Sequence, residues 1–313
     1  GQTVPMSYLM NYLISGLHVR SAVVVPAATP TDVGNVRVPD VTIRVESQID
    51  VPSDAHFQSE GIIAGDRDFL LRPINGLSFR IRHGREIVIS RMPGIPDRDV
   101  HLFLMGSAWG VLCHQRGLLP LHCSAVNVGR RVYMFLGPSG AGKSTLAAGL
   151  NRRGYEHFCD DVCIVQSEYQ GLTLWPMPKG LKLWRDAADA LGFQRGEPVS
   201  SDSRLDKYFV SLPGSETMAR VDHCALYLLS NSEASELEIS KVHGSARLGS
   251  LLSNVYRGEW LSLIRDPRDL FREVALMAKH LEVYRFSRPR DLSRFDEGLD
   301  LLVSHMEAAG GKP

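Results

Sequence analysis

Short β-prone runs separated by turn residues dominate the first third of the chain. The alternation of apolar and polar positions predicts strands over residues 22–25, 41–45, 68–71, 77–81 and 86–89. The turn residues His83, Gly84 and Arg85 lie between the last two runs and predict a hairpin there. Residues 1–95 are therefore expected to form a β-rich N-terminal domain.

A helical pattern follows this β-rich part. Asp97 and Asp99 open an apolar stretch over residues 100–115, and Gly117 ends it as a C-terminal helix cap does. We therefore expect a domain boundary at Pro96 and a second domain over residues 96–313. Within that domain, apolar runs that cover residues 121–128 and 132–136 predict two more strands, joined by a turn.

The second of these strands leads into a glycine-rich loop. Residues 137–145 read Gly-Pro-Ser-Gly-Ala-Gly-Lys-Ser-Thr, which matches the pattern G-x-x-x-x-G-K-[ST] between a strand and a helix. In such a loop, backbone N–H groups turn towards phosphate at a helix N-terminus, the lysine reaches the terminal phosphates, and the following hydroxyl holds Mg²⁺. A nucleoside triphosphate is therefore expected to contact Gly137, Ser139, Gly140, Ala141, Gly142, Lys143, Ser144 and Thr145.

A histidine precedes the loop by one strand and one turn. A hairpin centred near Gly129 and Arg130 places His122 opposite Leu136 or Gly137, at the mouth of the loop. A histidine there could orient a catalytic carboxylate or couple to its protonation. The alternative is a structural histidine that caps a strand end.

An acidic pair, Asp160 and Asp161, follows the loop, with Asp160 seventeen residues after Lys143. A helix over residues 144–153 rises roughly 15 Å at 1.5 Å per residue, and an extended segment over residues 155–159 returns about the same distance. The two carboxylates are thus expected level with the phosphates, where one serves Mg²⁺ and the other accepts a proton from an attacking hydroxyl. The alternative is a solvated acidic turn.

His122, the glycine-rich loop, the run Arg153-Gly154-Tyr155 and the acidic pair together resemble the catalytic core of bacterial HPr serine kinase/phosphorylase. The resemblance covers about residues 118–165 and is closer to the HPr-kinase-related proteins than to the regulator itself. It implies an α/β fold, with a P-loop nucleotide-binding core of the HPr-kinase type beside the smaller β-rich N-terminal domain. The sequence leaves open whether this N-terminal domain recognises the substrate; capture of an extended peptide by an edge strand is one hypothesis.

The resemblance also implies a chemistry. In this family the loop holds ATP, and the histidine that matches His122 supports an aspartate, here Asp160, that activates the substrate serine. Asp161 then helps to hold Mg²⁺, and Lys143 acts on the transferring phosphate. Relatives encoded with lasso-peptide clusters phosphorylate a serine of a precursor peptide. We therefore expect an ATP-dependent serine kinase that acts on a peptide or protein. Cores of this family are typically hexameric, which leaves a homo-oligomer open.

Part of the family pattern is missing. HPr kinases carry an acidic, arginine-containing signature after the paired aspartates, whereas residues 175–184 here read Trp-Pro-Met-Pro-Lys-Gly-Leu-Lys-Leu-Trp. Neither a phosphorylase activity nor HPr as the substrate therefore follows from the resemblance. Lys179, Lys182 and Lys207 are candidates for neutralising phosphate charge, and ordinary surface lysines are the alternative.

Two other functions stay open on the sequence. A small-molecule kinase that acts on an acceptor such as free serine would use the same chemistry with a different pocket. A nucleotide-gated binding protein without transfer activity would need the loop, but it would need neither His122 nor Asp160. Consumption of ATP only when an acceptor is present would separate a kinase from a binding protein.

Bulk composition narrows the partners. Of 313 residues, 44% are hydrophobic and 22% charged, and the formal net charge is zero, so no global field recruits nucleic acid or an anionic membrane. Five cysteines without metal-ligand spacing predict reduced thiols and no zinc site. No apolar run reaches the roughly 18 residues that span a bilayer, and no secretory signal is recognised. We therefore expect a cytoplasmic protein.

Overall fold

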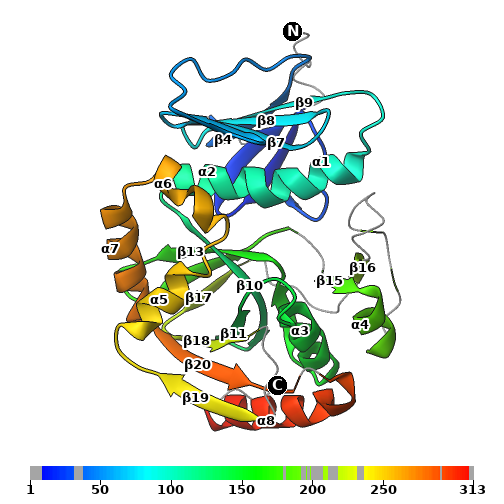
Figure 1. Cartoon of the computed structure of the whole chain (residues 1–313), viewed down its shortest axis with the longest axis vertical. Coiled ribbons are helices and arrows are strands. Elements are labelled where there is room, and N and C mark those ends of the chain that lie inside the picture. Colours follow the sequence, from blue (N-terminus) through cyan, green and yellow to red (C-terminus); the bar gives the residue numbers. More distant parts are fainter. Residues whose placement is uncertain are drawn as a thin grey trace.

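The structure is a computed structural model that describes residues 9–31, 38–178, 181–191, 195, 198, 207–210, 218–230, 236–289 and 291–309. Within these residues the chain is mixed α/β, with two nine-stranded sheets and a separate two-stranded ribbon. Figure 1 shows the N-terminal sheet at one end of the molecule, a helical segment beneath it, and the second sheet with its helices beyond that segment.

The N-terminal sheet has the strand order β3-β1-β2-β4-β9-β8-β7-β6-β5. Four of the five strands predicted for this part are confirmed, and so is the hairpin between the last two. The strands of the sheet are β1 (Met10–Ile14), β2 (Leu17–Ser21), β3 (Thr29–Pro30), β4 (Val41–Val45), β5 (Phe57–Ser59), β6 (Ile62–Gly65), β7 (Asp68–Ile74), β8 (Leu77–Arg82) and β9 (Glu86–Arg91).

The strand predicted over residues 22–25 is wrong. The chain leaves the sheet after Ser21, whose hydroxyl donates to the Val23 carbonyl at 2.6 Å and accepts from the Val23 N–H at 3.1 Å. This local turn engages the backbone groups that a strand would use for its ladder. The strand lies earlier in the chain, as β2, in a more polar run that the sequence pattern did not single out.

The helical segment predicted over residues 100–115 is confirmed. It consists of α1 (Asp97–Phe103), η2 (Leu104–Ala108) and α2 (Trp109–Gln115). η2 is a π-turn, in which Gly106 departs from helical geometry (φ −105°, ψ −108°). Trp109 is fully buried and donates its indole N–H to Ser15 Oγ at 3.0 Å. The side chains of this helical segment share one apolar core with the N-terminal sheet, so the two parts pack together on either side of Pro96. The domain boundary predicted at Pro96 stays a prediction.

The second sheet has the order β17-β14-β13-β10-β11-β18-β20-β19, and β12 pairs with β10 beside this path. β11, β18 and β20 are mutually parallel, and the other pairings are antiparallel. The strands are β10 (Leu119–Val128), β11 (Arg131–Leu136), β12 (Glu156–Cys159), β13 (Val162–Ser167), β14 (Leu172–Pro176), β17 (Ala219–Val221), β18 (Cys224–Leu228), β19 (Glu238–Val242) and β20 (Leu281–Ser287).

Helices cover both faces of this sheet (Figure 1). α3 (Lys143–Arg152) and α8 (Phe295–Ala308) pack on one face, and α5 (Ala246–Leu252), α6 (Leu261–Ile264) and α7 (Pro267–Ala278) pack on the other. The remaining elements are the ribbon strands β15 (Leu181–Trp184) and β16 (Lys207–Val210), α4 (Arg185–Ala190), and the short helices η3 (Gly258–Trp260) and η4 (Leu292–Arg294). Among the described helices, none is both long enough and apolar enough to span a membrane.

The hairpin predicted ahead of the glycine-rich loop is confirmed with its register. Cys123 pairs with Leu136, and Val128 pairs with Arg131 at the turn. His122 is therefore the next residue of β10 beyond the last pair, at the level of Gly137, as the sequence predicts. This register is what positions His122 at the start of the loop.

Candidate functional site

The candidate site lies where β10 is flanked by two strands that both run opposite to it. β11 pairs with one edge of β10, and β12 pairs with the other. Because both are antiparallel to β10, their carboxyl ends lie at the same end of the sheet. The glycine-rich loop leaves β11 there, and Asp160 and Asp161 leave β12 there. The return of the chain after α3 to the level of the loop is thereby confirmed.

The glycine-rich loop has a backbone that only glycine allows at its start. Gly137 has φ 156°, and a Cβ at this position would lie 2.6 Å from the carbonyl oxygen of Leu229. Gly142 precedes α3 in the left-handed region, with φ 96°, and no side chain caps the first turn of the helix. The N–H groups at the start of α3 therefore face the loop, in an arrangement that suits phosphate oxygens.

Lys143 is the first residue of α3 and is buried. Its ammonium is folded over the loop, where Nζ donates to the carbonyl oxygens of Gly137 at 2.7 Å and Pro138 at 3.0 Å. A phosphate in the loop would offer this ammonium a full negative charge in place of two neutral acceptors. The other predicted loop residues surround it: Ser139 and Gly140 are exposed, Ala141 is buried, and Thr145 borders a small cavity of about 90 Å³.

Asp160 is fixed against the loop rather than solvated. Its side chain is buried, with 1% of the residue exposed, and its Oδ1 accepts hydrogen bonds from Ser144 Oγ at 2.6 Å and Ser124 Oγ at 2.7 Å. Ser144 is the residue whose hydroxyl the motif assigns to a metal ion. The alternative of a solvated acidic turn therefore does not describe Asp160.

Asp161 lies on the other side of the bend, beside His122. Its backbone is left-handed, with φ 70°, and its Oδ1 lies 3.9 Å from His122 Nε2. The two side chains are 29% and 30% exposed, so both are accessible from solvent. Burial and then the charge of Lys143 lower the pKa of His122 to about 4, against the opposing effect of the two aspartates. His122 is therefore neutral at neutral pH.

In the structure the two carboxylates have different neighbours from those that the sequence predicts. The resemblance implies that His122 supports Asp160 and that Asp161 holds the metal. In the structure His122 lies beside Asp161. The Ser144 hydroxyl, which the motif assigns to a metal ion, donates instead to Asp160. Asp160 and Asp161 form the bend between β12 and β13, where the backbone of Asp161 is left-handed and the two consecutive side chains meet different neighbours.

Three residues near this site were missed by the sequence analysis. Ser124 could have been found, because it lies two positions after His122 on the same strand and therefore on the same face. Tyr256 and Arg257 come from a distant loop with no motif, and Tyr256 packs edge-to-face on His122 with ring centroids 6.0 Å apart. Of the three candidate lysines, Lys179 lies outside the described residues, and only the backbones of Lys182 and Lys207 are described, in β15 and β16.

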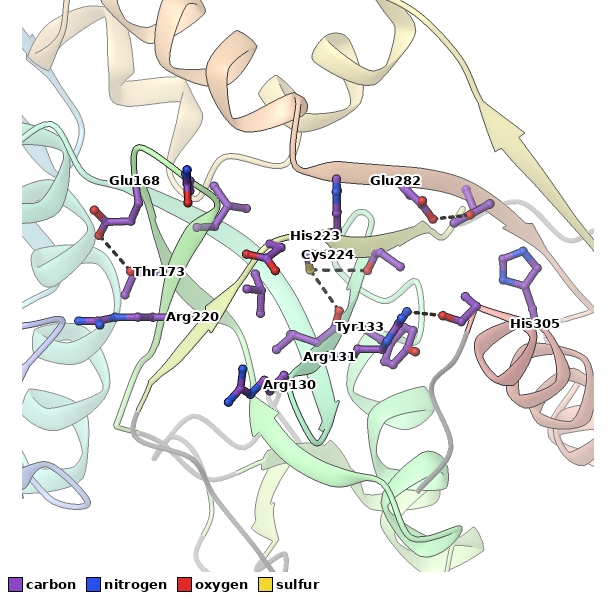
Figure 2. Close-up of a pocket in the computed structure, with 18 of the residues that line it drawn as sticks. Arg130, Arg131, Tyr133, Glu168, Thr173, Arg220, His223, Cys224, Glu282 and His305 are labelled. Carbon is purple, nitrogen blue, oxygen red and sulfur yellow. Dashed lines mark hydrogen bonds between the residues drawn. The ribbon is translucent and has the colours of Figure 1, made fainter.

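A larger cavity lies elsewhere, at the amino ends of the parallel strands. It encloses about 1290 Å³ between the β10–β11 turn, the β13–β14 turn and α8 (Figure 2). β11 separates it from the loop by roughly 20 Å, at about 3.3 Å per residue. Its charges balance, because three arginines face three carboxylates among the described residues that line it: Arg130, Arg131 and Arg220 against Glu168, Asp222 and Glu282.

Comparisons with known proteins give distant structural similarity and no sequence match. No model of a known protein family matches the chain, and no curated protein matches it. Among solved structures, the chain is similar to the HPr(Ser) kinase/phosphatase from Coxiella burnetii, with 12% sequence identity over 61% of this chain and 99% of that chain, and with a TM-score of 0.31.

Proposed function

We propose that this protein is an ATP-dependent kinase that transfers the γ-phosphoryl group to a serine hydroxyl of a peptide or protein. The observation that carries the proposal is the hydrogen bond between Ser144 and Asp160 at a glycine-rich loop, with the His122–Asp161 pair beside it. A nucleotide-gated binding protein would use the loop and the Ser144–Asp160 pair. It would have no use for the second carboxylate, that of Asp161, which is accessible from solvent.

The loop and Lys143 bind the phosphate chain in this proposal. Backbone N–H groups between Gly137 and α3 surround the phosphates, and Lys143 moves from the carbonyls of Gly137 and Pro138 to the terminal phosphates. Catalysis of phosphoryl transfer rests mainly on positioning and charge neutralisation, which these groups supply.

The residues around Ser144 fit a magnesium ion. The Ser144 hydroxyl and the Asp160 carboxylate are hard oxygen ligands held together, and Ser124 donates a second hydrogen bond to the same carboxylate oxygen. No group of three or more His, Cys, Asp or Glu side chains gathers as a metal cage in the described part of the chain, which suits an ion that takes most ligands from phosphate and water. When bound, Mg²⁺ neutralises charge on the β- and γ-phosphates.

Asp161 is the general base in this proposal, in place of the Asp160 expected from the sequence. It accepts the proton of the acceptor hydroxyl while that oxygen bonds to the γ-phosphorus. The bond between this phosphorus and the bridging oxygen breaks, and ADP leaves with the electron pair. Neutral His122 can donate Nε2–H to the carboxylate and orient it; the present 3.9 Å is longer than a hydrogen bond and would shorten when substrate binds.

Peptide capture is assigned to the N-terminal sheet. Within the described part of the chain its edge strand β5 pairs with β6 alone, and its three residues are exposed, so an extended peptide could add to that edge through main-chain hydrogen bonds. The acceptor serine would then be delivered across the helical segment to the His122–Asp161 pair.

The test is an intact-mass assay with Mg-ATP and a panel of acceptors: a precursor peptide encoded beside the gene, seryl peptides of varied flanking sequence, an HPr-like protein and free serine. The parent protein is compared with Asp161→Asn and, as a matched control, with Asp66→Asn on the distant β6–β7 turn. Gain of one phosphate on a peptide, lost only in Asp161→Asn, supports the proposal. Transfer to free serine alone would identify a small-molecule kinase, and ATP binding without any transfer would favour a binding protein.

A further inference from the structure

Residues 254–257, which lie far from the glycine-rich loop in the sequence, border the site on the side of His122 that faces away from the loop. We call this the acceptor side. The backbone after α5 lies against the start of β10: Asn254 accepts the His122 N–H at 2.8 Å, and the Tyr256 N–H donates to Pro120 at 2.9 Å. β11 leaves β10 at Cys123, so this segment continues along β10 from the point where the glycine-rich loop begins. Arg257 therefore lies beyond His122 as seen from the loop.

Arg257 has an unfavourable backbone conformation. Its φ is 54°, in the left-handed region that residues with a side chain rarely adopt. Asp161 has the same type of conformation at φ 70°. Such conformations persist where surrounding structure enforces them, and they cluster at binding and catalytic sites.

The guanidinium of Arg257 is held in place by its neighbours. Nε donates to Ser107 Oγ at 2.9 Å, and the guanidinium carbon lies 5.0 Å from the centroid of the Tyr256 ring and 5.3 Å from that of Trp260. Ser107 is buried and belongs to the π-turn η2, a kind of helix irregularity that occurs frequently at functional sites. The side chain is thus pre-organised by an element that packs under the N-terminal sheet.

The two terminal nitrogens of Arg257 remain available. Within the described residues they donate no hydrogen bond, and the nearest carboxylate, that of Glu259, lies 3.8 Å from Nη1 and is mostly exposed. The positive charge also reaches the site, because it contributes to the lowered pKa of His122. A fixed planar fork of donors with this geometry matches a carboxylate in a bidentate manner.

We propose that Arg257 is an acceptor-binding residue that holds a carboxylate next to the acceptor hydroxyl, so that the preferred substrate is an acidic seryl peptide. The inference rests on the proposed function and narrows its substrate class. The phosphates of ATP already have Lys143 and the loop, whereas the backbone of Arg257 stands roughly 10 Å farther along β10, about three residues beyond His122. A carboxylate bound there places the neighbouring serine over the His122–Asp161 pair.

The test uses three labelled seryl peptides of equal length, in which the serine is flanked by Glu, Gln or Lys. Binding is measured by fluorescence anisotropy with Mg-AMP-PNP present, and transfer is measured by intact mass with Mg-ATP. The parent should bind the Glu-flanked peptide about tenfold or more tightly than the Gln-flanked one, the factor expected for one charge-assisted contact. R257Q should remove this preference, and R257E should reverse it towards the Lys-flanked peptide.

Further variants separate binding from folding. Arg272→Gln removes an exposed arginine of α7 and should leave the acid preference unchanged. Ser107→Ala loosens the guanidinium and should lower the preference without abolishing it. If Arg257→Glu does not fold, Arg257→Lys is tested in its place. The lysine ammonium keeps the charge but loses the bidentate fork, so the acid preference should fall and not vanish. An undiminished preference in Arg257→Lys would then overturn the assignment.

The outcomes keep the two proposals apart. Equal binding of all three peptides by the parent, or an unchanged preference in R257E, overturns the role of Arg257 even if phosphate is transferred. An acid preference that R257E reverses, without any transfer from Mg-ATP, supports the role of Arg257 and contradicts the kinase.

Discussion

Ser144 Oγ donates to Asp160 Oδ1 at 2.6 Å, and Ser124 Oγ donates to the same oxygen at 2.7 Å. One carboxylate oxygen is thus shared by the loop and by the strand that carries His122. The two aspartates of the pair are consequently not interchangeable. Asp160 is buried and hydrogen-bonded, whereas Asp161 is partly exposed and adjoins the histidine.

This asymmetry predicts different defects for the two aspartates. Asp161→Asn should bind Mg-ATP as the parent does and lose transfer by about a hundredfold to ten-thousandfold, the usual contribution of a general base. Asp160→Asn should weaken the magnesium dependence of ATP binding as well as transfer. Isothermal titration with and without Mg²⁺, beside single-turnover transfer, measures both effects. Identical defects in the two variants would contradict the assignment of roles.

Lys143 should be needed for nucleotide binding and not for the fold. Its Nζ donates to the carbonyl oxygens of Gly137 and Pro138, which belong to the loop and not to the apolar core, so Lys143→Ala removes a phosphate ligand. We expect ATP affinity to fall about tenfold or more while the melting temperature shifts little. Lys279→Ala, an exposed lysine after α7, is the control. Unchanged affinity in Lys143→Ala would contradict the phosphate-binding assignment.

The start of the loop should not tolerate a side chain. In Gly137→Ala the Cβ would meet the Leu229 carbonyl oxygen at 2.6 Å, so loop and strand must separate. We expect lower ATP affinity together with a lower melting temperature. Gly129→Ala is the matched control, because Gly129 also has positive φ, at 56°, yet a Cβ there meets nothing within 4 Å. Equal effects of both substitutions would show that backbone strain, and not the shape of the loop, is responsible.

His122 should make stability depend on pH. Its folded-state pKa of about 4 lies below the unfolded value of about 6.5, so between these values the unfolded chain binds a proton that the folded chain does not. Stability therefore falls as the pH drops through this window. His122→Gln should lose less stability than the parent between about pH 7 and about pH 5, as measured by urea denaturation. The pKa of buried His114 is also lowered to about 4, but His114 is present in both proteins and cancels. Identical pH dependence would contradict the role of His122.

The C-terminal part should not fold without the N-terminal sheet. Trp109 and Leu112 are fully buried, in a core that also contains Phe79 and Ile81 of β8. A fragment of residues 96–313 would expose this side of α2, so we expect no cooperative unfolding transition by circular dichroism. Cooperative unfolding of the fragment, with parental ATP affinity, would instead support two independent domains.

Local pattern was enough for the elements that depend on neighbouring residues. The glycine-rich loop could be recognised in the sequence because each position of its motif serves one local backbone geometry. The lengths of α3 and of the strand after it could be predicted from the number of residues between the loop and the acidic pair. The register of β10 with β11 was also predictable, since a short turn fixes which residues of two antiparallel strands meet. β3 and β5 were missed because strands of two and three residues are too short to show an alternation.

What only the tertiary structure decided is which side chains meet across the site. Asp160 and not Asp161 meets Ser144, at a bend where Asp161 is left-handed, and no propensity scale assigns that conformation to an aspartate in advance. Arg257 reaches the site because a loop after α5 hydrogen-bonds to β10 and because a π-turn presents Ser107 to it. The sequence by itself determined a phosphate-binding loop with a histidine and two acids nearby, because those follow from local geometry. The partners of each acid and the acceptor side required long-range packing, which no local pattern encodes.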